Sequence, residues 1–167
     1  MHRLGGDGRL RGGHMNPVSY HDLVVGASYR STGRTLTQAD LSLSCMLSGD
    51  WHPIHADQAY CRERGIPGPM FHGPYGILLA MGMSTRLPEF AEPVIGALGL
   101  KEWQYRRPLV PGDTVHVCTS IHAKRIASGG RRAVVERHFA LVDAQSRVIQ
   151  EGYASTLLLL DPEEHTA

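Results

Sequence analysis

The sequence predicts an α+β domain in which a curved antiparallel sheet wraps around one long buried helix. The segment 73–85 (GPYGILLAMGMST) has no charged residue. Its apolar side chains lie all around a helix, which is typical of a helix buried on all sides. Four runs of strand-forming residues follow it and are joined by short turns, which favours an antiparallel sheet. A sheet that curves around this helix would bury the apolar helix and the apolar face of the sheet against each other, without a further layer of structure.

Composition supports a single folded domain. The chain has 167 residues, with 17 Lys+Arg against 16 Asp+Glu, a formal net charge of +1 and 42% hydrophobic residues. The near-zero charge argues against a nucleic-acid-binding protein, and no apolar run reaches the roughly 18 residues that a membrane span needs. The chain has three cysteines, and no two of them form a CxxC motif. This pattern favours reduced thiols in a cytoplasmic protein over a disulfide framework. These cysteines are Cys45, Cys61 and Cys118.

Two regions are expected along the chain: a flexible N-terminal arm over residues 1–16 and a single domain over 17–162. The arm is rich in Gly and Arg and has almost no apolar content. It also lacks the apolar core of a secretory signal, so we expect it neither to fold nor to direct export.

Short elements are expected before the central helix. They are a strand interrupted at Gly33 (29–36), a helix with Thr37 as its N-cap (38–47), a loop around Pro53, and one or two helical turns (57–64). In the central helix, Pro74 suits the first position because its missing N–H costs nothing there. Gly76 and Gly82 would let other backbone approach closely.

The strands are expected at 94–106, 114–124, 132–142 and 148–160, with turns at 128–130 and 144–146. In the second, Val115, Val117, Ile121 and Ala123 would share the inner face. In the third, that face would hold Ala133, Val135, Phe139 and Leu141. Gly152 would mark a bulge in the last strand. The open sheet leaves an edge that needs cover, and edge-to-edge homodimerisation is one solution.

The densest group of polar side chains lies in the segment 48–57 (SGDWHPIHAD). Histidine titrates near neutral pH, so the pair Asp50 and His55 can hold a water molecule and exchange protons with it. Pro53 stiffens the link between them. An alternative is that Asp50 only caps a turn and His55 is an ordinary hydrogen-bonded residue.

A second candidate feature is Phe71-His72-Gly73-Pro74 at the head of the charge-free helix. The first turn of a helix has unpaired N–H groups and carries partial positive charge. The Gly73 N–H is therefore a candidate donor to a carbonyl oxygen that gains negative charge during a reaction. The alternative is that Gly73 is only a helix cap.

These motifs resemble the MaoC-like, (R)-specific enoyl-CoA hydratase family. The resemblance rests on the segment 48–57, on Phe71-His72-Gly73 and on the later segment 107–113 (RPLVPGD), and it covers about residues 29–160. It implies a hot-dog fold, usually as a homodimer. It also implies that Asp50 and His55 are the catalytic pair and that Gly73 supplies the backbone donor to the thioester carbonyl. His52 departs from the family, which commonly has Asn there, so the hydrogen bonding and shape of this loop would differ.

The implied reaction is the reversible addition of water to a trans-2-enoyl-CoA, which gives a (R)-3-hydroxyacyl-CoA and needs no metal or other cofactor. Asp50 is by analogy the base and His55 the proton donor, although the pair should titrate as a unit. The side chains expected to bind substrate are His52, His72 and Tyr75 at the reacting end, and Arg106, Arg107, Lys124 and Arg125 at the phosphates of coenzyme A. Arg131 and Arg132 are further candidates for the phosphates. Each of these cations has the alternative of being ordinary solvated charge.

Three other functions remain open. The residues Asp50, His52, His55, Asp57 and His72 would suit a divalent metal, although their spacing is not that of a helical metal motif. A hot-dog acyl-CoA thioesterase would also use a carboxylate and a helix-end donor. The third is a protein that binds acyl thioesters without acting on them, or the inactive half of a hetero-oligomer.

Overall fold

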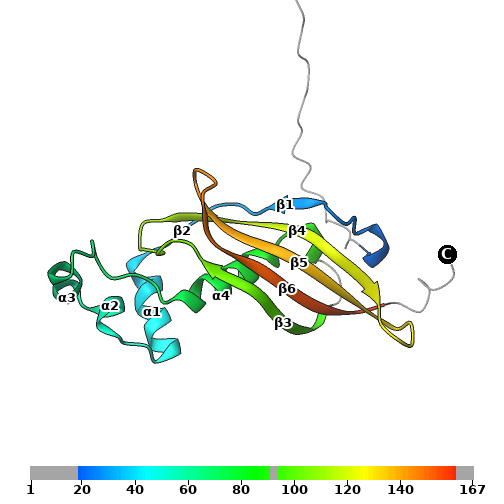
Figure 1. Cartoon of the computed structure of the whole chain (residues 1–167), viewed down its shortest axis with the longest axis horizontal. Helices are drawn as coiled ribbons and strands as arrows, with labels where there is room; N and C mark the ends of the chain where they lie inside the picture. Colours follow the sequence, from blue (N-terminus) through cyan, green and yellow to red (C-terminus); the bar gives the residue numbers. More distant parts are fainter. Residues whose placement is uncertain (1–18, 91–93, 161–167) are drawn as a thin grey trace, which may run out of the picture.

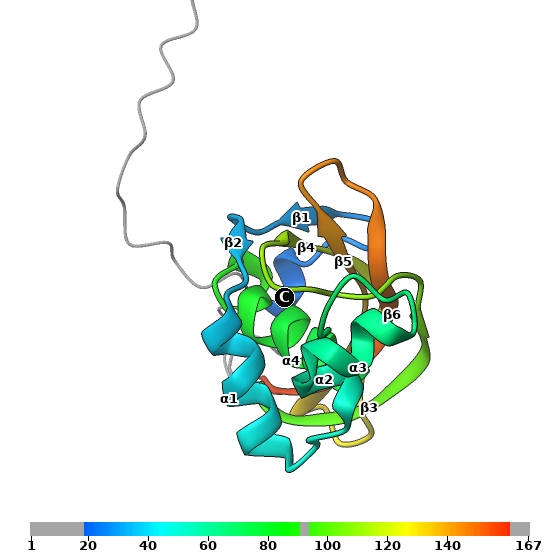
Figure 2. The ribbon, with the colours of Figure 1, turned by 90° about the vertical axis from the view of Figure 1, so that its left-hand side faces the viewer.

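The computed structural model describes residues 19–90 and 94–160, and there it shows an antiparallel sheet curved around one helix (Figures 1 and 2). The sheet has six strands in the order β1-β4-β5-β6-β3, and β2 also pairs with β4. The predicted α+β architecture is confirmed. The strands are β1 (Ser28–Arg30), β2 (Arg34–Thr35), β3 (Val94–Tyr105), β4 (Thr114–Ile126), β5 (Arg132–Asp143) and β6 (Val148–Leu159).

The helices gather at one end of the sheet, except for the central one, which lies in its concave face (Figure 2). None of those within the described ranges is long and apolar enough to cross a bilayer. They are α1 (Gln38–Ser48), α2 (Pro53–Ala56), α3 (Gln58–Glu63) and α4 (Gly73–Ser84), with 3-10 turns at Tyr20–Asp22 and Pro88–Phe90. The expected arm over 1–16 lies outside the described residues, so both expected domain boundaries remain predictions.

Helix α1 begins and ends as its sequence predicts. The Thr37 backbone N–H donates to Asp40 Oδ2 at 2.8 Å, and the Asp40 N–H donates back to Thr37 Oγ1 at 3.2 Å. The helix ends at Gly49, whose φ of +73° is a left-handed conformation that glycine adopts without strain. The chain then turns sharply into the segment that carries Asp50.

The expected loop around Pro53 is instead a helical turn. Proline begins α2 rather than ending a helix, because its missing N–H costs nothing at the first position. His52 caps this turn, with Nδ1 accepting from the Ile54 N–H at 3.2 Å. Asp57 caps α3 by accepting from the Ala59 and Tyr60 N–H groups at 2.8 and 3.0 Å.

The central helix α4 is not buried on all sides, contrary to expectation. The sheet covers only one side of it, where Leu79 and Ala80 are buried, and leaves Leu78 59% exposed on the other. The expected close approach occurs at Gly76, against the side chain of Gln150, but Gly82 faces open space. The helix with no charged residues is therefore only partly buried within a single chain.

Strand β5 follows the predicted alternation, with Ala133, Val135, Phe139 and Leu141 buried on the inner face. In β4 the prediction is wrong at Ala123, which is exposed. A register shift between Ile121 and Ala123 adds one residue and reverses the alternation beyond it.

Gly152 does not mark a bulge in β6. The irregularity lies opposite it, in β3 between Lys101 and Gln104. A Cβ atom at Gly152 would lie 2.6 Å from the Trp103 ring, so glycine is needed there to accommodate the indole. A glycine within a strand can mark either a bulge or a place where another group approaches closely, and at Gly152 the closely packed group is the Trp103 side chain.

Candidate active site

Asp50 and His55 lie side by side at the end of the domain that α1 and α2 form. The Asp50 Oδ1 atom accepts from the His52 N–H at 3.2 Å, which holds the carboxylate in the turn after α1. Helix α2 then places His55 so that its Nε2 is 3.5 Å from Asp50 Oδ2. The Asp50 side chain is 42% exposed and the His55 side chain 13%. The pair is thus open to solvent on the carboxylate side.

Hydrogen bonding at the other ring nitrogen determines the tautomer of His55. The Nδ1 atom is 2.7 Å from the Met70 carbonyl oxygen, which can only accept, so Nδ1 carries a hydrogen. In the neutral ring Nε2 is then an acceptor facing the carboxylate of Asp50, and in the protonated ring it is a donor. Two acceptors at this separation need a shared proton or a water molecule that donates to both.

Two more imidazoles surround His55. The His52 and His72 rings have their centroids 6.2 and 6.0 Å from that of His55. Burial lowers the pKa of His72, Asp50 counteracts this, and His55 lowers it further, so a neutral ring is favoured. The His72 Nδ1 atom is buried and has no hydrogen-bond partner among the described residues.

The N-terminus of α4 lies beside this group because His72 is its N-cap residue. The Gly73 N–H belongs to the first turn, and no acceptor for it occurs in the described part of the chain. A Cβ atom at Gly73 would lie 2.8 Å from Tyr105 Cε1, so a larger residue there would require the half-exposed Tyr105 ring to shift. The structure therefore places a free helix-end donor next to the Asp50–His55 pair.

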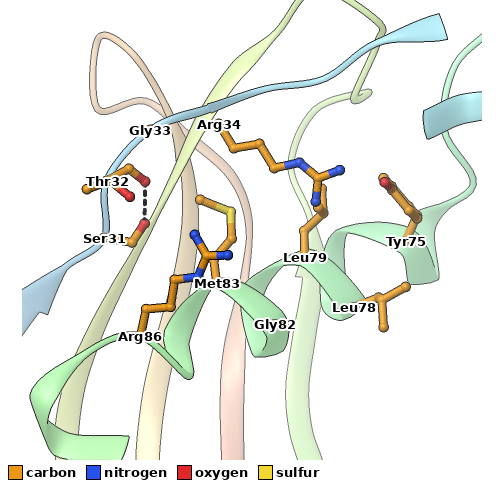
Figure 3. A pocket seen from close by; sticks show the side chains of 10 residues that line it. All are labelled: Ser31, Thr32, Gly33, Arg34, Tyr75, Leu78, Leu79, Gly82, Met83 and Arg86. Carbon is orange, nitrogen blue, oxygen red and sulfur yellow. Dashed lines mark hydrogen bonds between the residues drawn. The ribbon is translucent and has the colours of Figure 1, made fainter. Parts of the chain in front are cut away.

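Tyr75, whose ring centroid is 6.1 Å from that of His72, also lines a cavity of about 430 Å³ (Figure 3). The Tyr75 ring stacks on that of Phe71, with the ring centroids 4.6 Å apart. Burial raises the pKa of Tyr75, and the nearby Asp40 carboxylate raises it further. The cavity lies between α4 and the segment that joins β1 to β2. Its apolar wall consists of Leu78, Leu79 and Met83, and the guanidinium groups of Arg34 and Arg86 point into it.

The four predicted phosphate-binding cations do not converge. Arg106 pairs with Glu151 at 2.9 Å. Lys124 Nζ donates to the carbonyls of Tyr20 and His21 at 3.0 and 3.2 Å. Lys124 and Arg125 lie in the last part of β4, at the opposite end of the molecule from α2 (Figure 1). Within one chain, neither reaches the Asp50–His55 pair.

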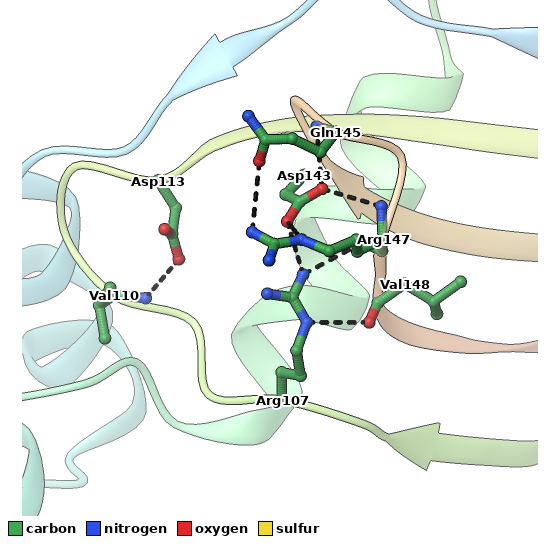
Figure 4. Close-up of polar contacts among 7 residues, drawn as sticks. All are labelled: Arg107, Val110, Asp113, Asp143, Gln145, Arg147 and Val148. Atoms are coloured by element: carbon green, nitrogen blue, oxygen red, sulfur yellow. Dashed lines mark hydrogen bonds and ion pairs between the residues drawn. The ribbon is translucent and has the colours of Figure 1, made fainter.

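Arg107 is held in an ion-pair group at the β5–β6 turn (Figure 4). Its Nη2 donates to Asp143 Oδ2 at 2.9 Å and its Nε to the Val148 carbonyl at 3.2 Å. Arg147 Nε donates to the same Asp143 oxygen at 2.7 Å. Burial raises the pKa of Asp143, but the bonds from Arg147 and Arg107 lower it more, to about 2. Arg107 thus has a structural role here.

This group predicts a specific acid sensitivity. The folded-state pKa of Asp143 lies below the unfolded value of about 3.9, so its contribution to stability is complete above pH 4 and is lost between about pH 4 and pH 2. We expect Asp143→Asn to lower Tm at pH 7. The difference from wild type should shrink as the pH falls towards 2, as followed by circular dichroism. A difference that is constant over this range would contradict the assignment.

Gln150 is a buried polar residue next to the candidate site that was not singled out from the sequence. Gln150 is 2% exposed, and its amide donates to the Gly73 carbonyl at 3.1 Å. It lies in phase with Gly152, Ala154 and Leu158 on the inner face of β6. A polar residue in an otherwise small or apolar row is a signal that the sequence offered.

Comparison with known proteins identifies the architecture. Residues 22–141 match the family model of the MaoC like domain. The chain is 28% identical to the protein MaoC of Klebsiella aerogenes over 124 residues, which are 70% of this chain but only 36% of that protein. A conserved Mycobacterium tuberculosis protein with a double hot-dog fold superposes with a TM-score of 0.76 at 23% identity, covering 88% of this chain and 46% of that one. The (R)-hydratase PhaJ1 of Pseudomonas aeruginosa superposes with a TM-score of 0.71 at 22% identity, covering 87% and 88%. The predicted hot-dog fold is confirmed.

Proposed function

Because this chain belongs to the MaoC-like dehydratase family, we propose that it adds water reversibly to a trans-2-enoyl-CoA and so forms a (R)-3-hydroxyacyl-CoA. The observation that carries the proposal is the Asp50–His55 pair, 3.5 Å apart and beside the first turn of α4. The fold shared with an (R)-hydratase is consistent with it. The chemistry uses side chains and a backbone amide, and it calls for no cofactor.

The pair accounts for both protons of the reaction. With one proton on His55 Nε2 and Asp50 ionised, Asp50 takes a proton from water while the water oxygen attacks C3. His55 then delivers its proton to C2. Water is thereby added as hydroxyl and hydrogen, and a proton transfer across the 3.5 Å between the two groups restores the starting state.

The helix end supplies the third contribution. Attack at C3 moves charge onto the thioester oxygen, where the Gly73 N–H and the positive end of α4 stabilise it. Removal of one such donor typically raises the barrier by about 2.7–4 kcal/mol. We also assign to His72 a contact with the thioester, because it directly precedes this donor in the chain and its ring centroid is 6.0 Å from that of His55.

We assign the cavity along α4 to the acyl group. It begins at Tyr75, next to His72, and its wall of Leu79 and Met83 is apolar. Among the four cations, we keep Arg106 as the candidate for the phosphates of coenzyme A, where a phosphate would replace its ion-pair partner Glu151. Arg106 follows Tyr105, whose ring contacts Gly73, and its side chain is 51% exposed.

Filling this cavity should change the preferred chain length. A Cβ atom at Gly82 would meet no atom within 4 Å, so Gly82→Leu places its side chain in the cavity without displacing the core. We expect kcat/KM to fall at least 10-fold for a long enoyl-CoA and to change little for crotonyl-CoA. Gly82→Ala, which adds one methyl group, is the control. An equal loss for all chain lengths would contradict the assignment.

The uncovered face of α4 and the edge strand β3 favour a homodimer. Leu78 is 59% exposed on α4, and Leu98 and Leu100 are 54% and 47% exposed on β3. A second copy paired along β3 would cover the edge strand and extend the sheet. Size-exclusion chromatography with light scattering tests this, and a monomer at micromolar concentration would contradict it.

A product assay tests the function itself. Hydration removes the absorbance of the conjugated enoyl thioester and releases no thiol, and chiral analysis should give the (R)-3-hydroxyacyl-CoA. Release of coenzyme A, detected with a thiol reagent, would show a thioesterase instead. No change with any enoyl-CoA would support a protein that only binds acyl thioesters.

A further inference from the structure

The buried amide of Gln150 joins the sheet to the first turn of α4. Its Nε2 donates to the Gly73 carbonyl at 3.1 Å, and its Oε1 accepts from Trp103 Nε1 at 3.1 Å. The residue is 2% exposed. These two bonds connect edge strand β3, inner strand β6 and α4 in one row.

The β3 end of this row is held by an irregular backbone. The register of β3 shifts between Lys101 and Gln104, and Glu102 has a φ of +52°. This left-handed conformation is unfavourable for a residue other than glycine, and such strain persists only where the surrounding structure imposes it. Trp103, the next residue, packs so closely over Gly152 that a Cβ there would lie 2.6 Å from the ring.

The α4 end of the row is packed as tightly. A Cβ atom at Gly76 would lie 2.3 Å from Gln150 Nε2, so the helix rests directly on the amide. The Gly73 N–H shares its peptide plane with the His72 carbonyl, which accepts from the Tyr75 N–H at 3.0 Å, and Gln150 holds the carbonyl of the next peptide. Contacts on these two successive peptides therefore hold the orientation of the Gly73 N–H.

We propose that Gln150 and Trp103 are positioning residues that aim the Gly73 N–H at the thioester oxygen as it gains negative charge. This inference rests on the proposed hydratase function. An apolar side chain would fill the same space without needing two hydrogen-bond partners, and the partners here converge on the helix end that faces the candidate site. Gln150 and Trp103 would affect the reaction through Gly73 and would not contact the substrate.

The test compares Gln150→Met and Trp103→Phe with wild type. The first keeps the length of the side chain but removes both hydrogen bonds, and the second removes the indole donor and part of the ring while leaving the bond to Gly73. We expect kcat for crotonyl-CoA to fall about 10-fold or more in Gln150→Met and less in Trp103→Phe, with KM within about twofold of wild type. The infrared carbonyl stretch of bound butyryl-CoA should move towards its value in water.

Two controls separate positioning from simple stability. Gln104→Met makes the same replacement at an exposed position of β3, and Leu158→Ala removes a buried side chain from a different cluster of the core. Both should retain the wild-type kcat and carbonyl frequency, although Leu158→Ala lowers Tm. If Gln150→Met does not fold, Trp103→Phe carries the comparison.

The outcomes separate the two proposals. A wild type that hydrates enoyl-CoA, with a Gln150→Met variant that matches it in kcat and carbonyl frequency, overturns the positioning role alone. Equal loss of kcat in Leu158→Ala would also overturn it. A wild type that hydrates no enoyl-CoA contradicts the proposed function, and the positioning role with it.

Discussion

Replacement of Asp50 by Asn should lower kcat for enoyl-CoA hydration by about 10³-fold, within the 10²–10⁴-fold range of general acid–base catalysis. The amide keeps the shape of the carboxylate but cannot accept a proton from water. The side chain is 42% exposed, so the fold should be unaffected. Steady-state rates from the loss of enoyl absorbance, together with Tm, measure both effects.

We expect His55→Asn to lower kcat for enoyl-CoA hydration by a similar factor. Its amide N–H₂ can replace Nδ1 as a donor to the Met70 carbonyl but offers nothing at the position of Nε2, so it removes the proton donor while preserving the anchor. Asp57→Asn is the matched control in the same segment, because Asn caps a helix as well as Asp does. Turnover close to wild type in either catalytic variant would contradict the mechanism.

Two of the glycines of α4, Gly76 and Gly82, should respond in opposite directions to replacement by alanine. In Gly76→Ala the new methyl group would lie 2.3 Å from Gln150 Nε2, and relief requires breaking hydrogen bonds that the amide makes to Gly73 and Trp103. Overpacking of this kind lowers the free energy of unfolding by about 1–3 kcal/mol. In Gly82→Ala the methyl group meets nothing, and the lost backbone entropy of glycine should increase stability by up to about 1 kcal/mol.

Urea unfolding of both variants and wild type measures this difference. The free energy of unfolding should differ by about 1–4 kcal/mol between the variants, although their sequence change is the same and they lie in one helix. An increase in stability for Gly76→Ala would show that the helix does not rest on Gln150.

Local sequence was sufficient for the candidate pair. Asp50 and His55 are five residues apart, and the intervening turn is capped by His52 and begun by Pro53. Capping and proline geometry act over a few residues, so this juxtaposition follows from the segment itself. The same holds for α1, whose start follows from Thr37 and Asp40.

The predicted cations show the opposite case. Arg106, Arg107, Lys124 and Arg125 are all basic, but three of them have partners far away in the sequence. These partners are Glu151 of β6, Asp143 of β5 and the carbonyl of Tyr20 in the first 3-10 turn. Basic residues alone do not indicate which of them are already paired within the fold. Gln150 illustrates the same limit, because its contacts with Gly73 and Trp103 join residues more than 40 positions apart.

The sequence by itself determined the order of elements, the inner face of β5, the family resemblance and the Asp50–His55 pair, because periodicity, caps and short motifs act locally. Tertiary structure decided the exposed face of α4, the bulges in β3 and β4, the cavity beside Tyr75 and the row from Trp103 to Gly73. These features depend on which strands meet and on how closely side chains pack across them. Neither property is present in a pattern of residues along one segment.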